Sequence, residues 1–71
     1  MTESLSISVN GMPRSLARDC ATVAHLIREM QLEGKRIAVE RNGEIVPRSR
    51  YADTALASGD RLEIVGAVGG G

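Results

Sequence analysis

The residues best suited to chemistry in this 71-residue chain are the last five, Ala67-Val68-Gly69-Gly70-Gly71. Three consecutive glycines add no side chains to a core, but without Cβ atoms they can enter a channel too narrow for other residues. In extended form, the stretch from Gly66 to Gly71 spans about 20 Å. We therefore interpret the Gly71 α-carboxylate as the candidate reacting group, with Gly70 and Gly69 providing clearance. The alternative interpretation is a frayed terminus without a function.

The remaining side chains offer little catalytic chemistry of their own. Cys20 is the only cysteine and His25 the only histidine, so neither a disulfide framework nor the spacing of a metal site is present. We interpret Cys20 as a small hydrophobic residue and His25 as a surface residue. Because no acid–base pair or activated nucleophile is visible, we do not expect an enzyme.

Composition indicates a single small globular domain, since 42% of the residues are hydrophobic and 25% are charged. A formal net charge of zero and an aromatic content of 1% argue against binding to nucleic acids or anionic membranes. The sequence contains neither a secretory signal pattern nor a long apolar run. We therefore expect a cytoplasmic protein that does not bind membranes.

The first third of the chain has the pattern of a β-hairpin. Residues 5–9 alternate strictly between apolar and polar, which predicts a half-buried strand. Asn10-Gly11 follows and favours a type I′ turn, because both central positions of that turn require positive φ. A returning strand is expected over residues 12–17, where Pro13 restricts it to the edge of a sheet.

One amphipathic helix is predicted after the hairpin. Thr22 is its expected N-cap, and apolar residues at 23, 26, 27 and 30 have the spacing of a single helical face. Gly34 is expected at the position that follows the helix C-cap. These signals predict a helix of about three turns that packs on a sheet.

The second half of the sequence predicts three more strands. Residues 37–41 and 44–46 flank a second Asn-Gly pair at 42–43, and Pro47 ends the shorter strand. An irregular segment, 48–57, is expected to be anchored by Tyr51 and Leu56, and a turn at 58–60 begins the last strand. In that strand the alternation directs residues 62 and 64 inward and residues 61, 63 and 65 outward. The predicted fold class is α+β, a mixed sheet of four to five strands with one main helix on one face, formed by residues 1–66 and followed by a flexible glycine-rich tail, 67–71.

Three segments resemble a known family: Asn42 to Arg48, Gly59 to Val65, and Ala67 to Gly71. They are similar to those of the ubiquitin-like β-grasp sulfur carriers, most closely the ThiS family of thiamin biosynthesis, and the similarity covers nearly the whole chain. That family ends on Gly-Gly, here Gly70-Gly71, and Gly69 is an additional glycine before it. The resemblance implies a β-grasp sheet in which the first and last strands lie side by side and parallel in the middle.

The resemblance also implies a reaction at Gly71 that other proteins catalyse. An E1-like adenylyltransferase of the ThiF type would activate the Gly71 carboxylate with ATP and Mg²⁺, and sulfur from a persulfide on another protein would then give a thiocarboxylate. Thiazole synthase (ThiG) would accept that sulfur for the thiazole ring of thiamin. In this interpretation the chain is a protein co-substrate without a tightly bound cofactor.

The outward face of the last strand adjoins the tail and is the candidate docking surface for partners. Its residues are Arg61, Glu63 and Val65, together with Ala67 and Val68 of the tail. Three alternatives remain: a MoaD-like carrier for molybdopterin synthesis, a ubiquitin-like protein modifier, and a non-catalytic β-grasp binding domain. The short length and the Ala-Val-Gly-Gly-Gly ending favour the thiamin carrier over MoaD, and a single lysine, Lys35, argues against chains of modifiers.

Overall fold

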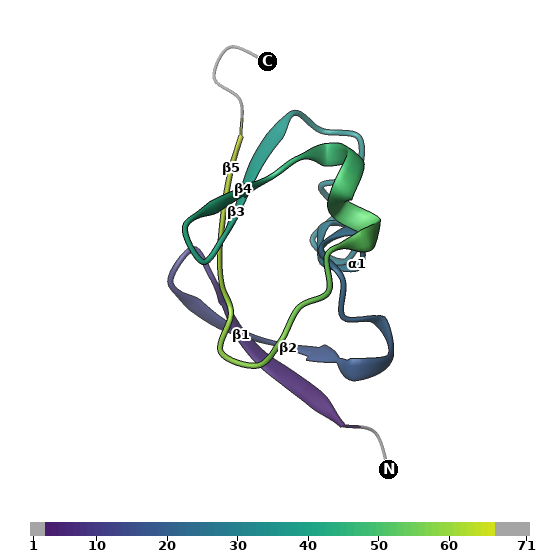
Figure 1. The fold of residues 1–71 in the computed structure, drawn as a ribbon, viewed down its shortest axis with the longest axis vertical. Coiled ribbons are helices and arrows are strands. Elements are labelled where there is room, and N and C mark those ends of the chain that lie inside the picture. The colour runs from purple at the N-terminus through teal and green to yellow at the C-terminus, as the bar shows by residue number, and fades with distance from the viewer. Residues whose placement is uncertain (1–2, 67–71) are drawn as a thin grey trace.

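The structure is a computed structural model that describes residues 3–66. Its elements, in chain order, are β1 (Ser4–Val9), β2 (Met12–Ala17), the 3₁₀ turn η1 (Arg18–Cys20), α1 (Val23–Glu29), β3 (Ile37–Arg41), β4 (Glu44–Val46), the 3₁₀ helix η2 (Arg48–Asp53) and β5 (Arg61–Gly66). The five strands form one sheet in the order β2-β1-β5-β3-β4. Figure 1 shows this sheet on one side of the molecule and α1 and η2 on the other. The predicted fold class is confirmed.

Both Asn-Gly pairs form the predicted turns. The φ angles are 53° at Asn10 and 83° at Gly11. At Asn42 and Gly43 they are 53° and 87°. Positive φ at both central positions matches the right-handed twist of the flanking strands, so each pair joins two adjacent antiparallel strands. The strand with Pro13, β2, lies at an edge of the sheet, as predicted.

The last strand lies in the centre of the sheet. It runs parallel to β1, in the register Ser8 to Arg61 and Val9 to Leu62. On its other side it pairs with β3 in antiparallel orientation, from Ile37 opposite Gly66 to Arg41 opposite Leu62. The topology that the family resemblance implied is therefore present, and the strand that leads to the tail is paired on both sides.

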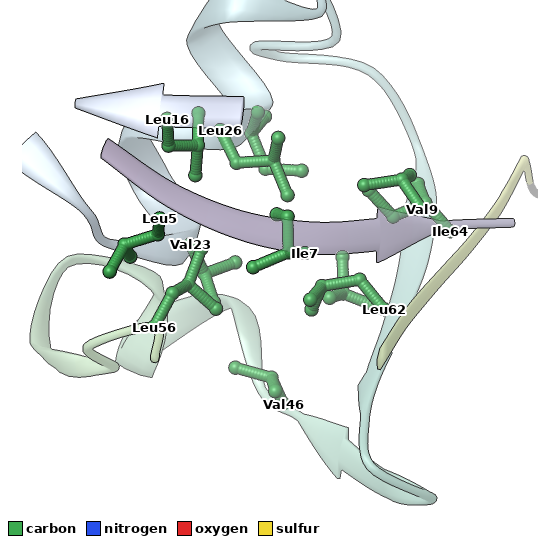
Figure 2. Packing of buried hydrophobic residues seen from close by; sticks show 12 residues of the cluster. Leu5, Ile7, Val9, Leu16, Val23, Leu26, Val46, Leu56, Leu62 and Ile64 are labelled. Atoms are coloured by element: carbon green, nitrogen blue, oxygen red, sulfur yellow. The ribbon is translucent and has the colours of Figure 1, made fainter. Parts of the chain in front are cut away.

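The core lies between the sheet and α1, where alternate residues of the strands meet the apolar face of the helix (Figure 2). Its twelve buried residues are Leu5, Ile7, Val9, Leu16, Val23, Leu26, Ile27, Val39, Val46, Leu56, Leu62 and Ile64. Burying a side chain of this kind contributes about 1.5–3 kcal/mol. The predicted anchors of the irregular segment are confirmed, since Leu56 is buried and Tyr51 is partly buried against the same cluster.

The start of α1 follows the prediction, whereas its length does not. The Oγ1 atom of Thr22 accepts a hydrogen bond from the backbone N–H of His25 at 3.2 Å, so Thr22 is the N-cap. The helix has seven residues, which is about two turns and not three.

The expected role of Gly34 was wrong, because the chain leaves the helix earlier. Gln31 has a φ of 61° and occupies the left-handed position after the C-cap, Met30. The N–H of Leu32 donates to the carbonyl of Ile27 at 2.9 Å, and that of Gln31 to the carbonyl of Arg28 at 3.0 Å. This is a Schellman motif, and Leu32 also packs against the core cluster that contains Ile27. With Leu32 packed on the core, the left-handed position after the helix falls at Gln31, three residues before Gly34.

Candidate functional site

The candidate site begins with β5, because this strand leads directly to residues 67–71. Beyond its backbone pairing, the strand is held by the side-chain amide of Asn10. The Nδ2 atom of Asn10 donates to the carbonyl of Ile64 at 3.1 Å, and its Oδ1 atom accepts from the N–H of Ile64 at 2.8 Å. Strand β1 ends at Val9, so this amide continues the parallel pairing of β5 for one further step.

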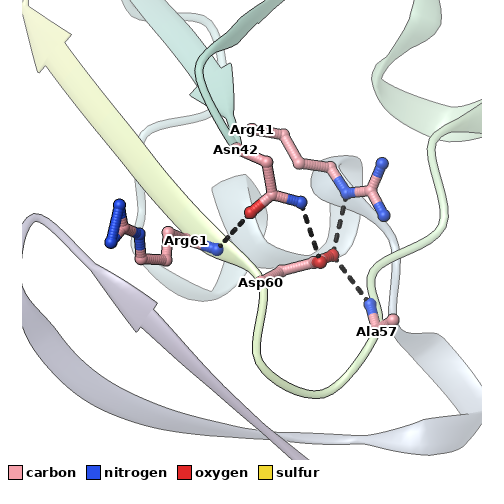
Figure 3. A network of polar contacts seen from close by, with 5 residues as sticks. All are labelled: Arg41, Asn42, Ala57, Asp60 and Arg61. Carbon is pink, nitrogen blue, oxygen red and sulfur yellow. Dashed lines mark hydrogen bonds and ion pairs between the residues drawn. The ribbon is translucent and has the colours of Figure 1, made fainter.

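The beginning of β5 is held by a polar network around Asp60 (Figure 3). Its Oδ2 atom accepts from Arg41 Nε and from the N–H of Ala57, both at 2.8 Å. Its Oδ1 atom accepts from Asn42 Nδ2 at 3.1 Å. The Oδ1 atom of Asn42 in turn accepts a hydrogen bond from the backbone N–H of Arg61 at 2.9 Å. The β3–β4 turn is thereby joined to the first residue of β5.

Asp60 is the one buried charged residue of the described part of the chain. Burial alone raises the pKa of its carboxyl group. The hydrogen bond from Ala57 and those from Arg41 and Asn42, with the positive charge of Arg41, outweigh burial and place the pKa below its usual value. The carboxylate form therefore stabilises the start of β5 at neutral pH.

The predicted docking residues of β5 share the outer face of the sheet, opposite the core. Arg61, Glu63 and Val65 are all exposed, and Val65 is 59% exposed. The predicted residues Ala67, Val68, Gly69, Gly70 and Gly71 lie outside the described residues. Three of the eight predicted site residues are thus placed on one surface.

Neighbouring strands add residues to this face that the sequence alone did not single out. Glu40 lies directly opposite Glu63, and Ala38 lies opposite Val65. On β4, Ile45 lies opposite Glu40 and is 67% exposed. The alternation of β3 around inward-facing Val39 could have predicted that residues 38 and 40 point outward. Which residues of β5 they face could not be predicted without the register between the two strands.

The face is hollowed at two places beside β5. A hollow of about 320 Å³ is lined by Glu40, Asn42, Gly43, Arg61 and Glu63. A second, of about 370 Å³, lies at the end of the strand and is lined by Arg36, Ile37, Ala38, Arg48, Val65 and Gly66. The first hollow is therefore lined mainly by polar side chains, whereas the second combines two arginines with apolar residues.

The histidine considered as a candidate for chemistry has a structural partner. His25 Nε2 lies 3.2 Å from Glu29 Oε2 on the same helix. Within residues 3–66, no group of three or more His, Cys, Asp or Glu side chains is arranged to hold a metal ion. No helix in this part of the chain is long and apolar enough to span a bilayer. The side chain of Cys20 lies outside what the structure describes.

Comparison with known proteins identifies the family. The sequence profile of the ThiS family matches residues 7–71, which includes β5 and the terminal glycines. The chain belongs to the ThiS family. A sulfur carrier protein ThiS of Bacillus subtilis is 40% identical over 65 residues, covering 92% of this chain and 98% of that protein. The resemblance inferred from the sequence is confirmed.

A solved ThiS structure agrees with the fold. The crystal structure of the thiamine biosynthesis protein ThiS from Geobacter metallireducens has a TM-score of 0.78 at 28% identity, covering 94% of this chain and all of that one. A second kind of relative is much longer. A thiazole synthase of Paramagnetospirillum magneticum is 43% identical over 67 residues, and the chain spans 20% of its length.

Proposed function

We propose that this chain is a sulfur carrier protein of thiazole biosynthesis in the thiamin pathway, acting in the cytoplasm. The observation that carries the proposal is the match to the ThiS family over residues 7–71, because it extends through the terminal glycines. The full-length similarity to a sulfur carrier protein ThiS supports it. In this role the chain is a co-substrate, and the catalytic groups belong to its partners.

The proposed reaction takes place at the Gly71 carboxylate. An α-carboxyl group has a pKa of about 3.5, so at neutral pH it is ionised and a poor electrophile. A ThiF-type enzyme uses Mg²⁺-ATP to form an acyl adenylate, with pyrophosphate as the leaving group. The terminal sulfur of a protein persulfide then displaces AMP, and reduction of the resulting S–S bond by a thiol leaves the Gly71 thiocarboxylate.

The domain contributes position and reach to this reaction. Pairing with β3 holds β5 as far as its last residue, Gly66, and pairing with β1 together with the Asn10 and Asp60 contacts holds the part up to Ile64. The five residues that follow can extend about 17 Å further, and their three glycines can pass through a narrow channel. Gly70 and Gly69 serve as clearance in this proposal, while Ala67 and Val68 join Arg61, Glu63 and Val65 in partner docking.

Thiazole synthase is the proposed acceptor of the sulfur. A segment similar to 94% of this chain occurs within a polypeptide named thiazole synthase, and that segment is a fifth of the longer protein. Joining the two in one chain is consistent with partners that act together, because a covalent link raises their effective concentration.

The proposal is tested by intact mass spectrometry. The protein is incubated with a ThiF-type enzyme, Mg²⁺-ATP and a persulfide donor, and we expect the mass to increase by the exchange of one oxygen for sulfur, localised to Gly71. A variant that lacks both Gly70 and Gly71, and so has no terminal Gly-Gly, should show no such change and should unfold at the same urea concentration, because the core residues lie between 5 and 64. Sulfur transfer by the truncated protein would refute the proposal. Coupling to thiazole synthase separates this role from that of a molybdopterin carrier.

A further inference from the structure

The hydrogen bonds between β3 and β5 show where the next backbone pair of this ladder belongs. The N–H of Asn42 donates to the carbonyl of Arg61 at 2.8 Å, so these two residues form a hydrogen-bonded pair. Hydrogen-bonded pairs recur at every second residue of an antiparallel ladder. Three steps of two residues along the observed register lead from this pair to Arg36 and Ala67. Within residues 3–66, Arg36 forms no backbone hydrogen bond, so its N–H and C=O are available to Ala67.

A mainly apolar hollow of about 180 Å³ lies beside this step, on the helix side of the sheet. Its lining includes Ile27, Leu32, Ile37 and Tyr51, which belong to the core or pack against it. Gly66 lies directly opposite Ile37 and has no side chain, and a Cβ atom there would meet no other atom within 4 Å. The strand β5 therefore leaves the hollow uncovered next to Ile37.

We propose that the side chain of Val68 occupies this hollow in the free protein, so that β5 continues to residue 68. The alternation that directs Leu62 and Ile64 inward also directs residue 68 inward. In the continued register, Val68 lies opposite Lys35, which lines the hollow. Val68 is the one large apolar residue among residues 67–71, and removing its methyl groups from water favours the docked position.

Docking of Val68 changes how far the end of the chain can reach. With residues 67 and 68 held on the domain, the three glycines extend about 10 Å. When Val68 leaves the hollow, all five residues extend about 17 Å from Gly66. A partner whose active site lies deeper than about 10 Å must therefore compete with the hollow for Val68. The inference goes beyond the proposed function, because the docking takes place without any partner.

The test is solution NMR of the free, full-length protein with ¹³C-labelled valine methyl groups. Tyr51 is the only aromatic residue, so its ring protons are identified without ambiguity. We expect a nuclear Overhauser effect between the Val68 methyl groups and the Tyr51 ring. We also expect the Ala67 amide to exchange about tenfold more slowly than in the variant Val68→Ser, as for a docked population of about nine-tenths. The matched control, Val65→Ser, changes an outward residue that is 59% exposed and should keep both signals.

A second variant tests the hollow without changing the tail. Ala24 lines the hollow, and the larger side chain of Ala24→Leu should displace Val68 and accelerate exchange of the Ala67 amide about tenfold. Three results would overturn the inference: no contact between Val68 and Tyr51, equal Ala67 exchange in the unmodified protein and Val68→Ser, or an equal acceleration in Val65→Ser. Failure of the proposed function is seen separately, because the mass assay then shows no thiocarboxylate whatever the position of Val68.

Discussion

Replacing Asp60 by asparagine tests whether the polar network at the start of β5 stabilises the domain. Both acceptor atoms of the carboxylate are in use, Oδ2 by Arg41 and Ala57 and Oδ1 by Asn42. Asparagine at position 60 keeps one acceptor oxygen, but its NH₂ group then faces a hydrogen-bond donor and cannot accept from it. Asn42 cannot rotate its own amide to compensate, because its Oδ1 atom accepts from the N–H of Arg61.

The expected loss at pH 7 is about 2–4 kcal/mol. Leaving a buried donor unsatisfied costs about 1–3 kcal/mol, and the hydrogen bond from Arg41 loses its charged acceptor. The Asp60 side chain is only 8% exposed, so water does not replace the lost partner. Since a domain of this size shifts its Tm by about 4–8 °C per kcal/mol, we expect a fall of roughly 8–32 °C.

The pH dependence has a definite sign. The folded pKa of Asp60 is below its unfolded value, so its stabilising contribution is fully present above about pH 4 and is lost as the pH falls through the folded pKa. Urea unfolding of the wild type and Asp60→Asn should therefore differ most from pH 5 to 7 and converge at lower pH. Asp53→Asn, an exposed carboxylate at the end of η2, is the control with the same charge change. A difference below about 0.5 kcal/mol at pH 7, or one that persists unchanged at pH 2, would refute the reasoning.

Two further substitutions test how other backbone positions are held. Asn10→Gly keeps the positive φ of the turn and removes both hydrogen bonds to Ile64. Urea unfolding should therefore show that the free energy of unfolding falls by about 1–2 kcal/mol. An unchanged midpoint would mean that the Asn10 amide does not stabilise β5. Gln31→Gly removes the strain of a non-glycine residue in the left-handed conformation and should raise the free energy of unfolding by roughly 0.5 kcal/mol. A decrease would show that the Gln31 side chain stabilises this end of the helix.

The sequence was sufficient to predict the elements of the fold. Strict alternation in residues 5–9 and 61–65 and the two Asn-Gly pairs gave strands and turns that agree with the structure. These signals are local in the sequence, and the strand and turn signals of adjacent segments agree with one another. The end of the helix was not predictable in the same way, because Leu32 packs on the core and imposes a left-handed conformation on Gln31. Tertiary packing there overrides the preference for glycine.

The candidate site was only partly predictable for a related reason. Outward positions of β5 followed from its own period, but the opposition of Glu40 and Glu63 depends on the register between strands that are far apart in the sequence. The Asp60 network likewise joins residues separated by 18 and 19 positions. The periodicity within one segment cannot predict such a contact.

The two asparagines of the turns connect local chemistry to the strand that carries the proposed function. Glycine and aspartate also tolerate the left-handed conformation that a type I′ turn needs. Of these three residues, only asparagine carries both a hydrogen-bond donor and an acceptor on a neutral side chain. Asn10 uses both on Ile64, and Asn42 uses both on Asp60 and Arg61, so each turn holds β5 at a different point. Turn geometry alone would accept several residues, whereas the paired donor and acceptor contacts that hold β5 at these two points depend on the asparagine amides.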